Sequence, residues 1–233
     1  LATDKVLYKG HPVAAIAATS PHLAEELLEL ISVEYTCLKE VIKVEDALKL
    51  DAPVLHDHWN QIDSSYSKNL AEVQKNTMGD LDHGFGQSDC IVEREFRTKS
   101  VHQGYIEPQT STAWWSPDNR LTIWTSTQGH FTVANNVARL LGISNSEVKV
   151  VPMEIGGGFG GKNPIYLEPV AAILSKKSGR PVKMTMTRSE VFEATGPTSG
   201  SYLKIKIGAS KEGRILAQPF MLIIIMITYL LNI

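Results

Sequence analysis

The stretch GGGFGGKN at residues 156–163 constrains the fold of this 233-residue chain more than any other feature. Five of its first six residues are glycine, and Phe159 has glycine on both sides. A strand-like pattern precedes the stretch and a helix-like pattern follows it. Because glycine has no Cβ atom, its main chain can turn sharply and come close to another group. The sequence therefore predicts a strand over 147–155, a tight glycine turn and a helix over 164–178.

A phosphate-binding loop is one interpretation of this stretch. Gly156, Gly161 and Lys162 fit most of the pattern GxxxxGK[ST]. However, Asn163 replaces the hydroxyl residue that would hold magnesium. Pro164 also removes a backbone N–H from the start of the helix, where a phosphate needs donors. These two substitutions disfavour a phosphate loop.

A dinucleotide-binding turn is the second interpretation, since Gly156, Gly158 and Gly161 fit GxGxxG. That fingerprint needs an acidic residue at the end of the next strand to bind the ribose. Arg188 occupies this position here, and Glu190 comes later than the fingerprint prefers. The glycine stretch alone leaves two interpretations open, a turn that only permits close packing and a turn pressed against another cofactor.

The composition excludes several classes of protein. The chain has 23 Lys and Arg residues against 25 Asp and Glu residues, so it has no basic field for nucleic acid or an anionic membrane. Cys37 and Cys90 form no CxxC motif, and we expect buried or half-buried free thiols in a reducing cytoplasm. His56, Asp57 and His58 have no third ligand at a fixed spacing, so solvated surface is expected there.

The remaining patterns predict an α+β fold that combines a mixed sheet with helices. Strands are expected on both sides of a turn at 10–12, over 32–38 and 90–98, in a hairpin around 117–119, and over 147–155, 180–189 and 201–210. Helices are expected over 20–31, 44–48, 130–141 and 164–178.

Three of these helices have a recognisable start or end. Ser20 can cap the first helix and Pro21 fits its first turn. Gly142 is expected to end the helix over 130–141, and Gly179 the helix over 164–178. Buried stripes are expected from Leu23, Leu27, Leu30 and Ile31 in the first helix, and from Val133, Val137, Leu140 and Leu141 in the helix over 130–141.

The ends of the chain are unusual for a natural protein. The first residue is Leu1, and the last 14 residues, FMLIIIMITYLLNI, carry no charge. A helix that spans a bilayer needs about 20 apolar residues. We expect a fragment whose last dozen or so residues are foreign. The alternative is a buried strand that has lost its partners.

Two motifs in order resemble the molybdenum hydroxylase family. They are TSTQGHF at 125–131 and GGGFGGK at 156–162. This family includes xanthine dehydrogenase, aldehyde oxidase and the large subunit of aerobic carbon monoxide dehydrogenase. DKVLYKGHPVAAIAA resembles part of the family's α/β hammerhead domain, and GYIEPQTSTAWW resembles the start of its first molybdopterin-binding domain.

The resemblance implies a division of the chain into four parts. Residues 1–42 would be the second half of an α/β hammerhead domain, and 43–76 a linker. Residues 77–217 would be part of the first molybdopterin-binding domain. Residues 218–233 depart from the family pattern and would be an apolar, foreign tail.

The resemblance also implies a cofactor, molybdopterin or its cytosine dinucleotide form, which carries the molybdenum. A pterin dithiolene holds the metal, so no side chain ligates it directly. Gln128 would donate its amide to the apical oxo group of molybdenum, although a cap for the helix over 130–141 is the alternative role. Phe159 and Gly160 would bring the glycine turn against the metal. The cofactor-binding set implied is Gln128, Gly129, Gly158, Phe159 and Gly160.

Position 163 bears on the substrate. Purine-oxidising members of the family have a glutamate directly after the glycine-rich lysine, whereas this chain has Asn163. Asn163 is therefore a candidate substrate-binding residue, and xanthine is disfavoured. Lys162 and Arg188 are interpreted as surface charges.

The reaction that the resemblance implies is hydroxylation of a small carbonyl or heteroaromatic compound, or oxidation of carbon monoxide, with water as the oxygen source. The general base would lie beyond the end of this chain, so the chain alone should be inactive. [2Fe–2S] clusters and FAD would reside on partner subunits in a cytoplasmic dimer of heterotrimers, with no nucleic acid and no membrane span. The alternatives are a nucleotide-binding protein that uses the loop at 156–162 and a non-catalytic assembly module.

Overall fold

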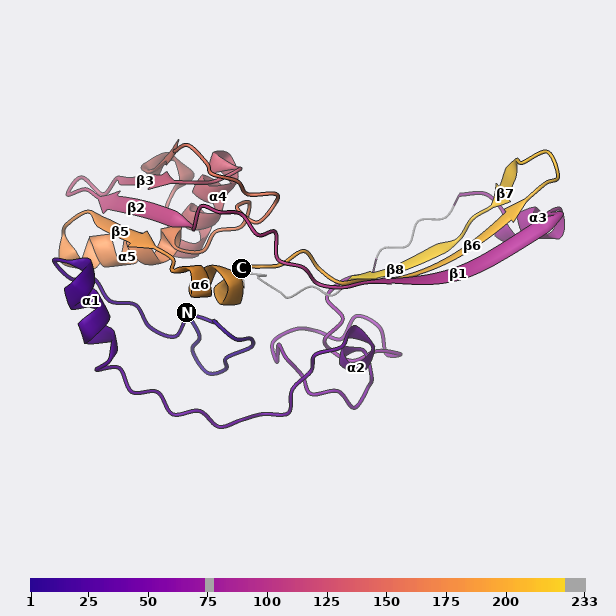
Figure 1. The fold of residues 1–233 in the computed structure, drawn as a ribbon, viewed down its shortest axis with the longest axis horizontal. Coiled ribbons are helices and arrows are strands. Elements are labelled where there is room, and N and C mark those ends of the chain that lie inside the picture. Colours follow the sequence, from indigo (N-terminus) through magenta and orange to yellow (C-terminus); the bar gives the residue numbers. More distant parts are fainter. Residues whose placement is uncertain (74–77, 225–233) are drawn as a thin grey trace. The chain divides into compact units, whose positions relative to one another are not determined.

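The computed structural model describes residues 1–73 and 78–224. The chain divides into two compact units. Unit 1 contains residues 1–35 and 102–198, and unit 2 contains residues 36–101 together with the described part of 199–227. Both units mix helices with strands, as the sequence predicts (Figure 1).

Unit 1 is built on a four-stranded sheet in the order β4-β3-β2-β5. The predicted hairpin is confirmed, since β2 (Thr110–Trp115) runs antiparallel to β3 (Leu121–Thr125). β4 (Val148–Pro152) runs parallel to β3, and β5 (Val182–Thr185) runs antiparallel to β2. The carboxyl ends of β3 and β4 therefore lie at the same edge of the sheet.

The core of unit 1 lies between this sheet and two helices, α4 (His130–Leu141) and α5 (Glu168–Ser178). Burial alternates along β2 and β3, so one face of each strand is covered. Apolar residues that are fully buried in this core are Ala113, Leu121, Ile123, Val133, Val137, Ala171 and Ala172.

Glycines end both helices, as predicted. Gly142 and Gly179 have φ angles of 64° and 63°, in the left-handed region that glycine adopts at little cost. α5 begins later than predicted, at Glu168 and not at Pro164. The buried Glu168 carboxylate accepts Thr125 Oγ1–H at 2.8 Å and the Tyr166 N–H at 2.9 Å, which fixes the start of the helix there.

The strand predicted over 180–189 stops at Thr185, and helix α6 (Arg188–Ala194) follows it. Thr187 Oγ1 accepts the Glu190 N–H at 3.2 Å, and Glu190 Oε2 accepts the Thr187 N–H at 2.7 Å. This reciprocal capping box starts a helix where the alternating pattern suggested a continuing strand.

The first 35 residues differ most from the sequence-based expectations. Helix α1 (Pro21–Leu28) is present, and Ser20 accepts the Leu23 N–H at 3.2 Å as predicted. The predicted buried stripe is wrong, since α1 has no buried residue and Leu30 is 77% exposed. The strands predicted on both sides of residues 10–12 and over 32–38 are also wrong, because these segments join no sheet among the described residues.

Unit 2 is built on a sheet in which β6 (Ser201–Ala209) pairs antiparallel with three other strands. Its partner β1 (Cys90–Thr98) was predicted, and it pairs with β6 along its whole length (Figure 1). Other elements described in the chain are α2 (Val44–Ala47), α3 (Leu81–Gly86), β7 (Ile215–Ala217), β8 (Phe220–Ile224) and, in unit 1, the 3-10 helix η1 (Asn145–Glu147).

The expectations for three side chains in unit 2, those of Cys37, Cys90 and His56, are wrong. Cys37 and Cys90 are exposed, although buried or half-buried thiols were expected. His56 is only 8% exposed, because its ring stacks on Trp59 with a centroid distance of 4.2 Å.

Of the predicted foreign tail, residues 220–224 form β8, and 225–233 lie outside the described residues. None of the helices described is long and apolar enough to cross a membrane.

We predict that Ile123→Ala destabilises the chain by about 2–5 kcal/mol, because it leaves a cavity between the sheet and the two helices. Ile123 is 0% exposed, whereas Ile173 on α5 is 43% exposed and provides the control Ile173→Ala. Urea unfolding measures both. Equal losses of stability in the two variants would contradict this placement of the core.

Candidate functional site

Residues 156–162, here called the glycine loop, connect β4 with the segment before α5. A tight turn closes the loop, since the Gly161 N–H donates to Gly158 O at 2.7 Å. Phe159 has a φ angle of 49°, and the residue is 74% exposed. An aromatic residue in the left-handed region is uncommon and often marks a functional constraint.

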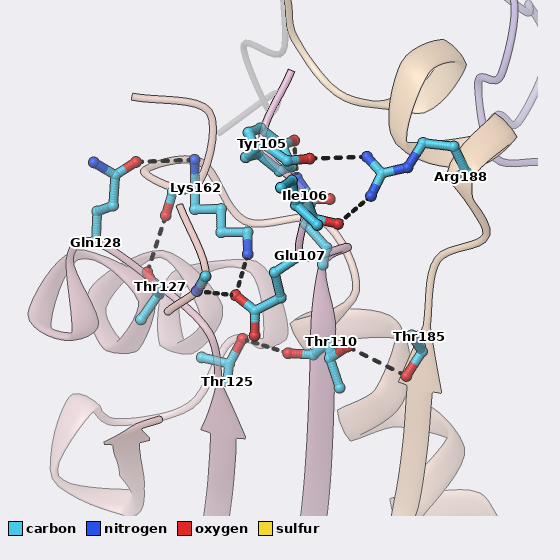
Figure 2. Close-up of polar contacts among 12 residues, drawn as sticks. Tyr105, Ile106, Glu107, Thr110, Thr125, Thr127, Gln128, Lys162, Thr185 and Arg188 are labelled. Carbon is cyan, nitrogen blue, oxygen red and sulfur yellow. Dashed lines mark hydrogen bonds and ion pairs between the residues drawn. The ribbon is translucent and has the colours of Figure 1, made fainter. Parts of the chain in front are cut away.

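Gln128 holds the glycine loop from the side of β3. Its Oε1 atom accepts the N–H groups of Gly160 at 2.9 Å and Lys162 at 3.2 Å. Its backbone N–H donates to Lys162 O at 3.1 Å, and Thr127 Oγ1 donates to the same oxygen at 3.1 Å. Figure 2 shows the carboxamide nitrogen of Gln128 turned away from Lys162, and this nitrogen has no hydrogen-bond partner among the described residues.

The alternative role of Gln128 as a helix cap is wrong. The N-cap of α4 is Gly129, and no side chain caps that helix. The Gly129 N–H donates instead to Thr127 Oγ1 at 3.1 Å. The side chain of Gln128 is therefore committed to the glycine loop.

The glycines of the loop serve two different purposes. A Cβ atom at Gly158 would lie 2.5 Å from Gln128 Oε1, and one at Gly161 would lie 2.7 Å from Tyr105 Cε1. These two glycines therefore permit close packing inside the protein. Gly160 has a φ angle of 88°, and a Cβ atom added there would meet no other atom within 4 Å, so its outer side is open.

A partly buried ion pair lies beneath the loop. Lys162 was expected at the surface, but its side chain is only 1% exposed and its Nζ atom lies 2.5 Å from Glu107 Oε2. The same carboxylate oxygen accepts the Gly156 N–H at 2.7 Å. The ammonium group also lies 5.2 Å from the centroid of the Tyr105 ring (Figure 2). The sequence does not suggest a role for Glu107, since 55 residues separate it from Lys162.

Tyr105, which the loop covers, belongs to a buried polar chain. Its hydroxyl group lies 3.2 Å from Thr195 Oγ1 and accepts a hydrogen bond from Gln109 Nε2. Thr195 Oγ1 donates to Val191 O at 2.5 Å, and His102 Nε2 lies 3.0 Å from Thr195 Oγ1. These hydrogen bonds tie the segment before β2 to α6 and give the loop a rigid support.

Arg188 and Asn163 are both exposed. The Arg188 guanidinium is nevertheless anchored, because it donates to Tyr105 O at 2.9 Å and to Ile106 O. Asn163 follows the buried Lys162 directly, and its backbone N–H donates to Gly160 O at 3.3 Å. The structure thus brings together Gln128, Gly129, Phe159, Gly160 and Asn163 in one short stretch of surface, with the buried Gly158 beneath them.

The geometry disfavours both nucleotide interpretations of the loop. The Lys162 ammonium group is paired with Glu107 inside the protein, so it cannot also bind a phosphate. No helix starts directly after the loop, because α5 begins only at Glu168. The N–H donors of a helix terminus are therefore not directed at the loop.

A groove of about 530 Å³ opens on the sheet beside the ion pair. Glu107 contributes to both the groove and the ion pair, so a substitution of Glu107 would change both. No three His, Cys, Asp or Glu side chains gather as metal ligands in the described part of the chain. The groove is lined by Glu107, Thr110, Thr112, Trp124, Ser126, Met153, Glu154 and Lys183.

Comparison with protein families identifies a match to the molybdopterin cofactor-binding domain over residues 62–225. The chain is 32% identical to the nicotinate dehydrogenase large molybdopterin subunit of Eubacterium barkeri, over 93% of this chain and 49% of that protein. It is also 32% identical to the xanthine dehydrogenase molybdenum-binding subunit of Escherichia coli, over 91% of this chain and 27% of that protein. The chain thus spans half or less of the length of these relatives.

Among solved structures, the fold is similar to that of the aldehyde oxidoreductase from Desulfovibrio gigas, with a TM-score of 0.76. The match covers 89% of this chain and 22% of that protein, at 22% sequence identity. At this identity the likeness concerns the fold alone.

We predict that Gly158→Ala displaces the Gln128 side chain, because the added methyl group would overlap Gln128 Oε1. Amide hydrogen exchange should then be faster at Gly160 and Lys162, which both donate to that oxygen. Gly86→Ala is the control, since no atom lies within 4 Å of its added Cβ. Unchanged exchange at both amides in Gly158→Ala would contradict this packing.

We also predict an acid-sensitive contribution to stability from His102. Burial lowers the pKa of its imidazole below the ordinary 6.5. The hydrogen bond to the Val191 carbonyl raises this pKa, whereas the positive charge of Arg188 lowers it further. Its Nδ1 atom accepts the Gly104 N–H at 3.0 Å, which also favours the neutral ring. Because the folded-state pKa is lowered, the contribution is present above pH 6.5 and is lost as the pH falls through the folded-state pKa.

Unfolding of wild-type protein and His102→Gln between about pH 7.5 and pH 5 measures this effect. The wild-type free energy of unfolding should fall more steeply toward acid than that of the variant. Parallel curves would show that His102 makes no such contribution.

Proposed function

The chain belongs to the molybdopterin cofactor-binding domain family, and from this premise we propose that Gln128 and the glycine loop form part of the surface that holds a molybdenum–pterin cofactor. One observation carries the proposal. The Gln128 carboxamide is fixed by two loop N–H groups, so its Nε2 donor points outward beside the open main chain of Gly160.

The groups at this surface fit such a cofactor. The Gln128 Nε2 group is a neutral donor, which can stabilise negative charge on an oxygen atom without taking up a proton. Gly160 has no Cβ atom and faces open space, so a bulky group can reach its main chain. The exposed Phe159 ring adds an apolar surface next to both.

When bound, the cofactor would supply a two-electron oxidation of a carbon centre with water as the oxygen source. The residues of this chain would then bind and orient the cofactor. Gln128 would donate to an oxygen of the cofactor, and Phe159, Gly160 and Gly129 would line its binding surface, with Gly158 packed beneath them. A general base would come from another part of the full subunit.

The exposed Asn163 is the side chain proposed to face the substrate. Its neutral amide can donate and accept a hydrogen bond but offers no negative charge. We therefore propose a small carbonyl or heteroaromatic substrate, or carbon monoxide, over a purine that needs a carboxylate partner.

The resemblance to the family also suggests the domains and partner subunits of the proposed enzyme. Residues 1–42 would be the second half of a hammerhead domain and residues 77–217 part of the first molybdopterin-binding domain. [2Fe–2S] and FAD subunits would carry electrons away in a cytoplasmic dimer of heterotrimers. The relative from Eubacterium barkeri, named a large molybdopterin subunit, supports a multi-subunit enzyme.

Metal and pterin analysis of the intact protein that carries this chain tests the proposal. The expected result is stoichiometric molybdenum, measured by mass spectrometry, together with a pterin detected by the fluorescence of its oxidised form. An assembled complex without either component would overturn the proposal.

We predict that Gln128→Glu slows substrate oxidation about 100- to 1000-fold, the usual cost of removing one preorganised donor. Glutamate keeps an oxygen that can accept the Gly160 and Lys162 N–H groups, but it replaces the Nε2 donor by a negative acceptor. Steady-state rates per bound molybdenum measure the effect, and hydrogen exchange of the loop verifies that its structure is kept. A rate near that of wild type would exclude Gln128 as the donor.

A further inference from the structure

We propose that Lys162 and Glu107 form a partly buried latch, here meaning their ion pair, that positions the glycine loop and Gln128 toward the cofactor. The inference rests on the proposed function, but it concerns two residues to which neither the family resemblance nor the comparisons assign a role. Both would be positioning residues, since they act through Gln128 and the loop.

Lys162 is bonded at each of its polar groups. Its backbone N–H donates to Gln128 Oε1 at 3.2 Å, and its carbonyl oxygen accepts from the Gln128 N–H at 3.1 Å and from Thr127 Oγ1 at 3.1 Å. Its ammonium group is paired with Glu107 at 2.5 Å. One residue thus joins the segment after β3, the glycine loop and the segment before β2 (Figure 2).

Glu107 ties the two ends of the loop to one carboxylate. Its Oε2 atom accepts the Gly156 N–H at the start of the loop and the Lys162 ammonium at its end. The Glu107 N–H also donates to Gly156 O at 3.3 Å. The loop is therefore closed at its base, while its tip at Phe159 and Gly160 stays open.

Because the Lys162 side chain is buried, its ammonium group has little access to a partner other than Glu107. The Lys162 side chain is 1% exposed and that of Glu107 is 33% exposed. Removing Glu107 would leave the ammonium group of Lys162 buried without a partner, which is strongly unfavourable. The loop consequently keeps the one geometry in which the ammonium group meets the carboxylate.

The direction of the Gln128 donor depends on this geometry. Gln128 Oε1 accepts two N–H groups, and both belong to the loop that the latch holds. If the loop shifts, the carboxamide loses the two contacts that turn its Nε2 atom outward. The latch therefore acts on the cofactor surface without contact between Lys162 and the cofactor.

The test compares Lys162→Met with Lys177→Met in the intact protein. Methionine keeps most of the aliphatic stem of Lys162 but removes the ammonium group. Lys177 is an exposed lysine on α5, so it provides the same substitution outside the latch. If Lys162→Met fails to fold because Glu107 is left unpaired, the double variant Lys162→Met with Glu107→Gln removes both charges and carries the test.

Two measurements are made on each variant. The first is amide hydrogen exchange of a peptide covering residues 156–163 in protein produced without molybdenum cofactor. Lys162→Met, or the double variant, should exchange about ten- to a hundredfold faster there, since a hydrogen-bonded charge is lost. The second is molybdenum per chain at limiting cofactor, which should reflect an affinity about ten- to a hundredfold lower. Lys177→Met should match wild type in both.

The outcomes separate the two proposals. Wild-type exchange in the Lys162 variants would overturn the latch, whatever the metal content. Faster exchange with unchanged molybdenum content would overturn the link between the latch and the cofactor. Wild-type protein without molybdenum would overturn the proposed function, whereas the exchange measurement would still decide whether the latch orders the loop.

Discussion

The hydrogen bonds between Gln128 and the main chain of the glycine loop join the segments that follow two neighbouring parallel strands. β3 ends at Thr125 and β4 ends at Pro152, and parallel pairing places both ends at one edge of the sheet. Ligands of open sheets commonly bind outside the carboxyl ends of such strands. The topology therefore brings Gln128 and the loop together, and the carboxamide fixes the loop once it is there.

Packing and close approach were alternative explanations of the glycines, and the structure assigns them to different positions. Gly158 and Gly161 leave room for Gln128 and Tyr105, so their purpose is internal packing. Gly160 combines a left-handed φ angle with an open outer side, so it alone of these three leaves the main chain accessible. The glycines of this one sequence motif therefore have two roles: some pack inside the protein, and Gly160 keeps the main chain accessible at the surface.

The sequence predicted those parts of the fold that depend on local signals. The β2–β3 hairpin and the ends of α4 and α5 have turn residues or glycines at fixed positions, and all were confirmed. The strands expected over 32–38 and around 10–12 failed because alternation shows that a segment can form a strand, not that a partner exists. The contact between Lys162 and Glu107 could not be predicted, since it joins residues 55 positions apart. The proximity of Gln128 to Gly158 and Gly160 was expected from the family resemblance and not from periodicity.

The position of the lysine distinguishes this loop from a phosphate loop with nearly the same letters. A lysine that binds phosphate must present its ammonium group to the ligand, whereas Lys162 directs it into the protein toward Glu107. The charge is neutralised there, and the surface above is left with the Gln128 carboxamide, the Gly160 main chain and the Asn163 side chain. All three groups are neutral, and the Gln128 and Asn163 side chains can donate hydrogen bonds, whereas the Gly160 N–H already donates to Gln128 Oε1. Such a surface favours a large group with weakly charged oxygen or sulfur atoms over a phosphate. A phosphate would need a positive charge at the surface, and the Lys162 ammonium group is paired with Glu107 inside the protein.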